Sequence, residues 1–212
     1  MEMFTPRKAI FACVCINCFL IILISNYISI PEEINQALVF NRAMNSSSVQ
    51  NQNGYDDGDR GVTLFEIHYA KSGTECAISS SYPQNVRQWC ILIQKYAWET
   101  GLDSNLVAAI ILYESDGNSQ AYSQSGAVGL MQIMPSNGIA AAFQCQHGPC
   151  FSQRPTMQEL FNPEFNIYYG TLLFSRLLTH YGNLREALRM YGPSDCGYSY
   201  ADEVLRIYTL YK

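Results

Sequence analysis

The sequence predicts an all-α domain with long loops, preceded by an N-terminal transmembrane or signal-anchor helix and a flexible linker. Three observations lead to this prediction: a charge-free apolar run near the N-terminus, a polar stretch over 41–61, and apolar residues at three- and four-residue steps through most of 85–212. A length of 212 residues suits one domain with extensions. We therefore divide the chain into residues 1–30, 31–84 and 85–212.

The N-terminal segment has the pattern of a membrane anchor. Arg7 and Lys8 precede residues 9–24, which carry no charged side chain, and this order predicts export with the two basic residues left in the cytoplasm. Residues 9–30 reach the roughly 20 residues needed to span hydrocarbon. Residues 25–28 do not have the small-residue pattern of a cleavage site. We predict a retained single-pass anchor in the cytoplasmic membrane; a cleaved signal peptide, with secretion, is the alternative.

The linker is predicted from composition. Residues 41–61 consist mainly of Asn, Ser, Gln, Gly and Asp, with few apolar side chains. Such a stretch cannot offset its ordering entropy by burial, so we expect it to be disordered and to act as a tether. For residues 62–84 two alternatives stay open: one strand, over 62–69, or an adapter segment.

The charge balance excludes one class of partner. The chain carries 13 basic and 18 acidic residues and has no basic run beyond Arg7 and Lys8. Proteins that grip phosphate backbones present a concentrated basic face. We therefore expect no nucleic-acid binding.

The remaining chain has helical periodicity with local start and stop signals. Gly101 is a candidate C-cap for the first helix, and Asp103 is a candidate N-cap for the second. Long loops are expected at 116–130 and 144–156. Helices are expected over 85–100, 106–115, 164–181, 184–191 and 200–211, with a short helix after Pro135.

Five cysteines lie beyond the anchor: Cys76, Cys90, Cys145, Cys150 and Cys196. Export would permit disulfides, and Cys145 with Cys150 could close a short loop at little entropic cost. Cys76 with Cys90 is a weaker second pair, which leaves Cys196 over; other pairings stay open. A structural zinc site around His147 lacks a fourth ligand, so we expect no metal.

Glu114 is the candidate catalytic residue. It occupies the fourth place of an apolar stripe that begins Val107, Ile110, Ile111, near the C-terminus of its helix. Desolvation and the negative end of the helix dipole both raise a carboxyl pKa, which suits a general acid for glycosidic-bond cleavage. The alternative is an ordinary glutamate facing solvent. Asp116 would point to another side of the helix and is a poor second carboxylate.

The stretch from Glu114 to Pro135 is more specific. It contains Glu114-Ser115, Ala121-Tyr122-Ser123 and Gly126-Ala127-Val128-Gly129-Leu130-Met131-Gln132-Ile133-Met134-Pro135. This pattern resembles the signature of the lytic transglycosylases, whose soluble-lytic-transglycosylase-like catalytic domain is related to goose-type lysozyme. Residues 162–167 with Gly170, and residues 187–191, resemble the family's later blocks. The resemblance covers roughly 85–212 and implies a lysozyme-like helical domain with long cleft loops.

The resemblance also assigns residue roles. It implies that Glu114 is the single catalytic acid and base. It places Ser123, Gln132 and Tyr191 where they would hydrogen-bond the glycan or the catalytic carboxyl, and Met131 on the wall of the cleft. Each has a structural alternative, since Met131 and Tyr191 could belong to the core and Ser123 could cap a turn.

Two positions depart from the family pattern. Gly117 stands where an aromatic residue is common, and Gly192 stands where Asn is common. The first lacks a packing anchor and the second lacks a polar contact near the cleft. Among the other tyrosines, Tyr200, Tyr208 and Tyr211 fit the packing stripe of a helix.

The implied reaction is cleavage of the β-1,4 bond between N-acetylmuramic acid and N-acetylglucosamine in bacterial peptidoglycan, with formation of 1,6-anhydro ends. The family mechanism needs no metal or organic cofactor. The implied partners are peptidoglycan glycan strands and the membrane through residues 9–30, with cell-wall or secretion machinery as further candidates. A lysozyme-like hydrolase and a non-catalytic glycan-binding scaffold are the alternatives.

Overall fold

The computed structural model describes residues 76–194 and 196–212, so the predicted anchor, linker and candidate strand over 62–69 lie outside the described residues. The described part is helical, as predicted, and its strands are the two-residue segments β1 (Gln144–Cys145) and β2 (Gly148–Pro149). None of its helices is both long enough and apolar enough to cross a membrane. The helices are α3 (Gln84–Arg87), α4 (Cys90–Thr100), α5 (Ser104–Ser115), the 3₁₀ helix η3 (Gly138–Ala142), α6 (Met157–Leu160), α7 (Pro163–Tyr181), α8 (Leu184–Tyr191) and α9 (Ser199–Tyr211).

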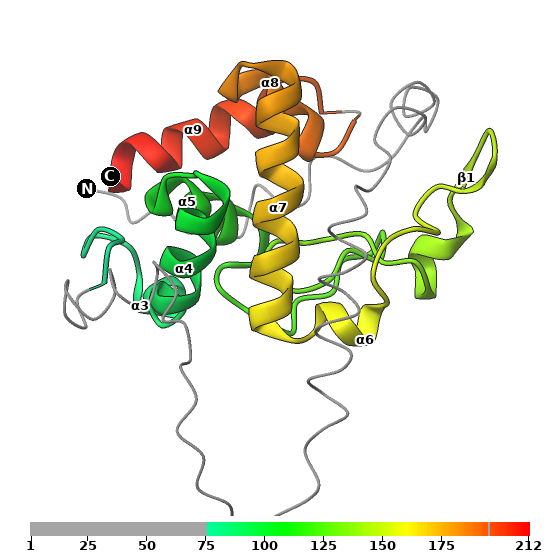
Figure 1. The fold of residues 1–212 in the computed structure, drawn as a ribbon, viewed down its shortest axis with the longest axis horizontal. Helices are drawn as coiled ribbons and strands as arrows, with labels where there is room; N and C mark the ends of the chain where they lie inside the picture. The colour runs from blue at the N-terminus through cyan, green and yellow to red at the C-terminus, as the bar shows by residue number, and fades with distance from the viewer. Residues whose placement is uncertain (1–75, 195) are drawn as a thin grey trace, which may run out of the picture.

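The long helix α7 runs through the domain and organises the others around it (Figure 1). It packs against α4, while α6 precedes it at one end and α8 follows it at the other. Helix α5 packs between α4 and α9. The shared core is apolar and includes Ile93, Ile110, Phe174 and Leu188, all fully buried.

Helix α5 is the most deeply buried helix and carries Glu114. Asp103 caps it as predicted, because its carboxylate accepts a hydrogen bond from Asn105 N at 2.8 Å. Seven consecutive residues, 106–112, are buried. The helix ends at Asp116, which adopts a left-handed conformation with φ 52°.

The predicted helix over 85–100 is wrong in one respect, since the structure divides it into α3 and α4. Trp89 has φ −92° and ψ 4° and does not continue the helix. Its indole Nε1 donates instead to the Gly117 carbonyl oxygen at 2.9 Å, a contact to the turn after α5. A long-range contact therefore accompanies the break in an otherwise helical pattern. The predicted C-cap, Gly101, does end α4 with φ 70°.

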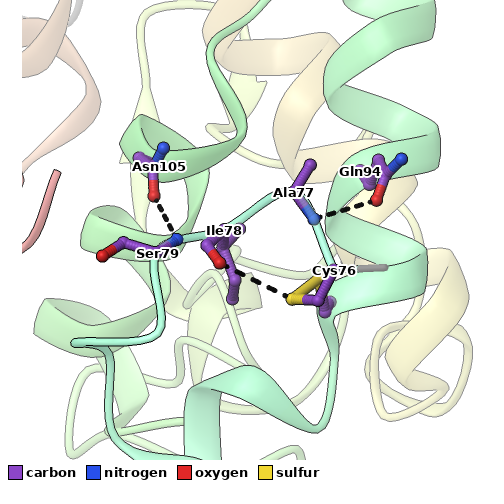
Figure 2. The surroundings of a disulfide bond; sticks show 7 residues. Cys76, Ala77, Ile78, Ser79, Gln94 and Asn105 are labelled. Carbon is purple, nitrogen blue, oxygen red and sulfur yellow. Dashed lines mark hydrogen bonds between the residues drawn. A yellow bond between two sulfur atoms is a disulfide. The ribbon is translucent and has the colours of Figure 1, made fainter. Parts of the chain in front are cut away.

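The chain enters the domain along a segment fastened to α4 and α5. Figure 2 shows this segment beside the disulfide of Cys76, which bonds to Cys90 at the start of α4. Ala77 N donates to Gln94 Oε1 at 3.2 Å, and Ser79 N donates to Asn105 Oδ1 at 2.8 Å. The folded part thus includes residues 76–84, upstream of the predicted boundary at 85.

The second predicted disulfide closes a hairpin. Cys145 bonds to Cys150, and β1 pairs antiparallel with β2 in a turn that projects from the helices (Figure 1). The expectation that Cys196 is left over is wrong, because Cys196 is itself disulfide-bonded. The prediction failed because five cysteines lie beyond the anchor, and pairing four of them leaves one without a partner.

Two short helices complete the fold. The short helix expected after Pro135 is the 3₁₀ helix η3. Helix α6 was not predicted, and it begins with a capping box in which Thr156 Oγ1 accepts from Glu159 N while Glu159 Oε2 accepts from Thr156 N. At four residues, α6 is too short to show a hydrophobic period.

Candidate active site

Glu114 lies in the last turn of α5, where the core meets the surface. The residue is half-buried, and Tyr200 donates a hydrogen bond from its hydroxyl to Glu114 Oε1 at 2.6 Å. Burial raises the pKa of Glu114 to about 7, while the hydrogen bond from Tyr200 acts in the opposite direction. The carboxyl therefore holds or releases a proton near neutral pH, as a general acid and base requires.

Tyr200 comes from the first turn of α9 and is 2% exposed. Its ring meets the Tyr113 ring edge-on at 5.0 Å between centroids, and the Tyr191 ring lies 6.4 Å away. The sequence pattern predicts a packing role for Tyr200 and does not indicate its hydroxyl contact. Periodicity identifies the buried face of a helix and gives no information on the partner of a hydroxyl on that face.

Tyr191, at the end of α8, is within electrostatic reach of the same carboxyl. Its hydroxyl donates to the Met131 carbonyl oxygen at 2.8 Å, and its ring meets Phe174 edge-on. Burial, followed by the nearby charge of Glu114, raises the pKa of Tyr191 well above its usual value. Three elements, α5, α8 and α9, thus converge on one carboxylate.

The loop that contains the sequence signature is held by the buried side chain of Asn166 on α7. Asn166 Oδ1 accepts from Met131 N at 2.8 Å, and its Nδ2 donates to the carbonyl oxygens of Val128 and Leu160, each at 2.9 Å. Gly129 has φ 77°, and a Cβ there would lie 2.8 Å from Asn166 Cγ. Glycine at this signature position therefore permits both the turn and the close approach of the amide.

Two of the predicted polar residues stabilise this loop from within. Ser123 Oγ accepts from Ala127 N at 2.8 Å. Gln132 Nε2 donates to the carbonyl oxygens of Gly129 at 2.9 Å and Ala121 at 3.3 Å. Both side chains are partly exposed. Their predicted contacts to a glycan stay predictions.

Met131 lies in the same loop but is fully buried. Its side chain packs against Gly170 of α7, where a Cβ would lie 2.9 Å from Met131 Cβ. Its backbone, rather than its side chain, reaches the site, because its carbonyl oxygen accepts from Tyr191. Ser115 Oγ donates to the Leu130 carbonyl oxygen at 2.8 Å and so ties the loop to the end of α5.

The other nearby carboxylates have partners of their own. Asn85 Nδ2 donates to Asp116 Oδ1 at 2.8 Å and holds it toward α3. Glu203 forms an ion pair with Arg206 at 2.7 Å. Within residues 76–194 and 196–212, no group of three or more His, Cys, Asp or Glu residues could hold a metal ion. Glu114 differs from them, because the partner of its Oε1 is the uncharged hydroxyl of Tyr200.

Gly117, the first departure from the family pattern, is explained by packing. It has φ 73°, and a Cβ there would lie 2.6 Å from the carbonyl carbon of Asn85 in α3. Trp89 hydrogen-bonds its carbonyl oxygen. The turn after Glu114 therefore packs directly against α3, and a side chain at position 117 would collide with the Asn85 backbone.

Comparison with known proteins places this architecture in a family. Residues 91–195 match the family described as Transglycosylase SLT domain, and this part of the chain belongs to that family. The predicted resemblance is therefore confirmed. The match includes Glu114, Tyr191 and the whole signature loop, while Tyr200 lies just beyond it.

A curated relative shares part of the sequence. Over 97 aligned residues, this chain is 37% identical to the membrane-bound lytic murein transglycosylase E of Buchnera aphidicola subsp. Acyrthosiphon pisum (strain APS). The aligned region spans 46% of this chain and 42% of that protein, so the chain matches less than half of the relative's length.

Two solved structures are also similar. An inactive mutant of lytic transglycosylase Slt from Pseudomonas aeruginosa is 23% identical, with a TM-score of 0.46, over 57% of this chain and 23% of its own. The 70 kDa soluble lytic transglycosylase from Escherichia coli is 26% identical, with a TM-score of 0.39, over 56% of this chain and 18% of its own.

Proposed function

We propose that this protein is a peptidoglycan lytic transglycosylase that cleaves the β-1,4 bond between N-acetylmuramic acid and N-acetylglucosamine. The observation that carries the proposal is the Glu114 carboxyl, whose burial raises its pKa to about 7 and whose Oε1 accepts from Tyr200. Membership of residues 91–195 in the transglycosylase SLT domain family supports the choice of bond. The products are expected to carry 1,6-anhydro-N-acetylmuramic acid ends.

The first step uses the protonated form of Glu114. The carboxyl donates its proton to the glycosidic oxygen, the bond from that oxygen to C1 of the muramoyl residue breaks, and the glucosaminyl residue leaves with a hydroxyl group. The acetamido oxygen of the muramoyl residue bonds to C1 and stabilises the positive charge. Because Tyr200 donates to Glu114, it stabilises the carboxylate that this step produces.

The second step returns the proton to Glu114. The carboxylate removes the proton of the C6 hydroxyl, O6 bonds to C1, and the bond from C1 to the acetamido oxygen breaks. The anhydro ring closes and Glu114 is protonated again. Two-carboxylate glycosidases use a second Asp or Glu for the corresponding step, whereas here one carboxyl serves twice. A pKa near 7 suits both forms.

The remaining site residues would hold the glycan. We propose that Ser123 and Gln132, uncharged and partly exposed, bind hydroxyl or acetamido groups beside Glu114. Tyr191 would contact the glycan or orient the site through its bond to Met131. Met131 would shape the cleft wall through its backbone, because its side chain is buried.

We also propose that the protein is attached to the bacterial cell membrane through residues 9–30, with 31–84 as linker and adapter and 85–212 as the catalytic domain outside the cytoplasm. The last part of the adapter, residues 76–84, packs on the catalytic domain. The predicted anchor and the name of the membrane-bound relative support this. Alkaline carbonate extraction of membranes should leave the full chain in the pellet and release a variant lacking 9–30. If expression of the full chain instead yields a soluble protein whose mass shows that the N-terminal segment has been removed, the segment is a cleaved signal peptide.

Mass spectrometry of the muropeptides released from purified peptidoglycan tests the reaction. The full chain should release fragments with anhydromuramoyl ends, and Glu114→Gln should release none. Glu99→Gln provides a matched control, because Glu99 is an exposed glutamate on α4. Equal release by the wild type and Glu114→Gln would contradict the proposed role.

The alternatives give different results in the same assay. Release of reducing muramoyl ends would identify a lysozyme-like hydrolase. Retention on peptidoglycan without release, by the wild type and Glu114→Gln alike, would identify a glycan-binding scaffold.

A further inference from the structure

Gly192, the second departure from the family pattern, follows the last residue of α8. Its N–H donates to the Leu188 carbonyl oxygen at 3.0 Å and ends the helix. Its φ is −72° and its ψ is −179°, an extended conformation that any residue can adopt. The backbone conformation therefore does not require glycine at this position.

The space around Gly192 does require it. A Cβ on Gly192 would lie 2.5 Å from Tyr200 Cδ1, closer still to Tyr200 Cγ, and 2.9 Å from Tyr200 Cβ. Real Cβ atoms essentially never approach other heavy atoms to within 3.0 Å. The Tyr200 ring thus lies directly on the Gly192 backbone, in the volume that any other side chain would fill.

The Tyr200 ring has little freedom to move away. It is almost fully buried, and the rings of Tyr113 and Tyr191 lie near it. Close-packed interiors respond to an added group by off-rotamer side chains and shifted backbone. The ring carries its hydroxyl to Glu114 at 2.6 Å, so even a small displacement lengthens that hydrogen bond.

We propose that Gly192 is a positioning residue for the reaction, because its missing side chain provides the space that lets Tyr200 reach Glu114. This inference rests on the proposed function. It also reverses the expectation from the family pattern, where Asn at this position would add a polar contact. In this protein, restoring Asn should impair the site.

The pH profile of the reaction depends on the groups that face Glu114. Tyr200 and Tyr191 face it from α9 and α8, and Tyr113 precedes it on α5. Charged groups act on these phenols: the carboxylate of Glu203 on Tyr113, and the guanidinium of Arg154 on Tyr191. Tyr191 is the chain neighbour of Gly192, so the experiment must separate a shift of the pH profile that comes through Tyr200 from one that comes through Tyr191.

The experiment is the pH dependence of kcat and KM for Gly192→Asn in the full chain, with soluble glycan strands as substrate. We expect kcat to fall by up to about 100-fold, the order of loss that a ~1 Å misplacement of a catalytic group can cause, with KM changed far less. The alkaline limb should move to higher pH, because the Tyr200 hydrogen bond lowers the pKa of Glu114. Gly182→Asn is the matched control, since a Cβ there meets nothing within 4 Å and Asn tolerates the left-handed φ of 61°.

Combination with Tyr200→Phe tests the route. If Gly192 acts through the hydroxyl, then adding Gly192→Asn to Tyr200→Phe should shift the alkaline limb no further. A further shift of the same size would overturn the inference, as would wild-type kcat and pH profile in Gly192→Asn alone. Should Gly192→Asn fail to fold by circular dichroism, Gly192→Ala replaces it, assayed below its melting temperature.

Failure of the inference and failure of the proposed function give different results. An active wild type with an unaffected Gly192→Asn variant removes the role of Gly192 only. A wild type that releases no anhydromuramoyl ends removes the proposed reaction, whatever the Gly192 variants do.

Discussion

Tyr200 donates a hydrogen bond to Glu114, 86 positions earlier in the chain, at 2.6 Å. The contact joins the first turn of α9 to the last turn of α5, two helices that pack against each other. Burial raises the pKa of the Glu114 carboxyl, and the hydrogen bond from the neutral Tyr200 hydroxyl lowers it. The proton affinity of the site is therefore a balance between a long-range contact and local burial.

Removal of the Tyr200 hydroxyl should shift the pH profile upward. Tyr200→Phe keeps the ring but loses the donor, so the pKa of Glu114 should rise above its value of about 7. The alkaline limb of the pH profile of kcat/KM, which reports the acid of the free enzyme, should move to higher pH. The maximal rate should fall by up to about 100-fold, because Glu114 loses the contact that positions it. An unchanged limb would contradict the role of the hydroxyl. Tyr208→Phe, on the same helix, is a control.

Glu114→Gln should stabilise the fold at alkaline pH. The carboxyl pKa is about 7 in the folded protein and 4.5 in its ordinary state, so between these values the folded chain binds more protons than the unfolded chain. The free energy of unfolding therefore decreases as pH rises through this window. Glutamine removes that penalty, which amounts to at most about 3 kcal/mol above pH ~7.

Urea denaturation at two pH values checks this prediction. The stability gain of Glu114→Gln over the wild type should be present near pH ~8 and should shrink toward pH ~4, where the carboxyl is protonated in both states. A gain that is independent of pH would indicate a packing effect and would contradict the assignment.

Loss of the Cys76–Cys90 disulfide should destabilise the domain. The bond closes a loop with a sequence separation of 14, and the chain-entropy model gives about 3 kcal/mol for a loop of this size. Cys76→Ser with Cys90→Ser should lower the free energy of unfolding by that order in chemical denaturation. The matched pair Cys145→Ser with Cys150→Ser should cost less, about 2 kcal/mol, because its separation is 5. The reverse order would refute this.

Asn166 should be required for both fold and activity. Asn166→Ala would leave the Met131 N–H and the carbonyl oxygens of Val128 and Leu160 without their partner in the interior. Unpaired buried polar groups cost about 1–3 kcal/mol each, so we expect a loss of several kcal/mol in the free energy of unfolding. Asn162→Ala, which removes only the α7 N-cap, should cost about 1 kcal/mol. Equal losses would contradict the central role of Asn166.

The features predicted from sequence are those determined by neighbouring residues. Gly101 and Asp103 mark the helix ends that flank the turn before α5, and the position of Glu114 on the apolar stripe indicates a carboxyl at the edge of the core. The disulfide between Cys145 and Cys150 follows from short separation. In each case the relevant interaction lies within a few residues along the chain, where composition and spacing are informative.

The features that were missed depend on distant partners. The break at Trp89 accompanies a hydrogen bond to Gly117, and the role of Tyr200 depends on a residue in α5. Likewise, burial of the Met131 side chain depends on Gly170 of α7, which leaves room for it. Periodicity gives the face on which a residue lies but cannot identify its partner across the fold.

The Cys76–Cys90 bond has a mechanical consequence. Tension that reaches the domain along the chain from upstream passes at Cys76 into a covalent bond with the first residue of α4. Residues 77–89 lie inside the closed loop and bear none of that load. Among them are Asn85 and Trp89, which hold the turn immediately after Glu114. A protein pulled by its N-terminal side would therefore transmit force to the helical body while the turn beside the Glu114 carboxyl stays unloaded.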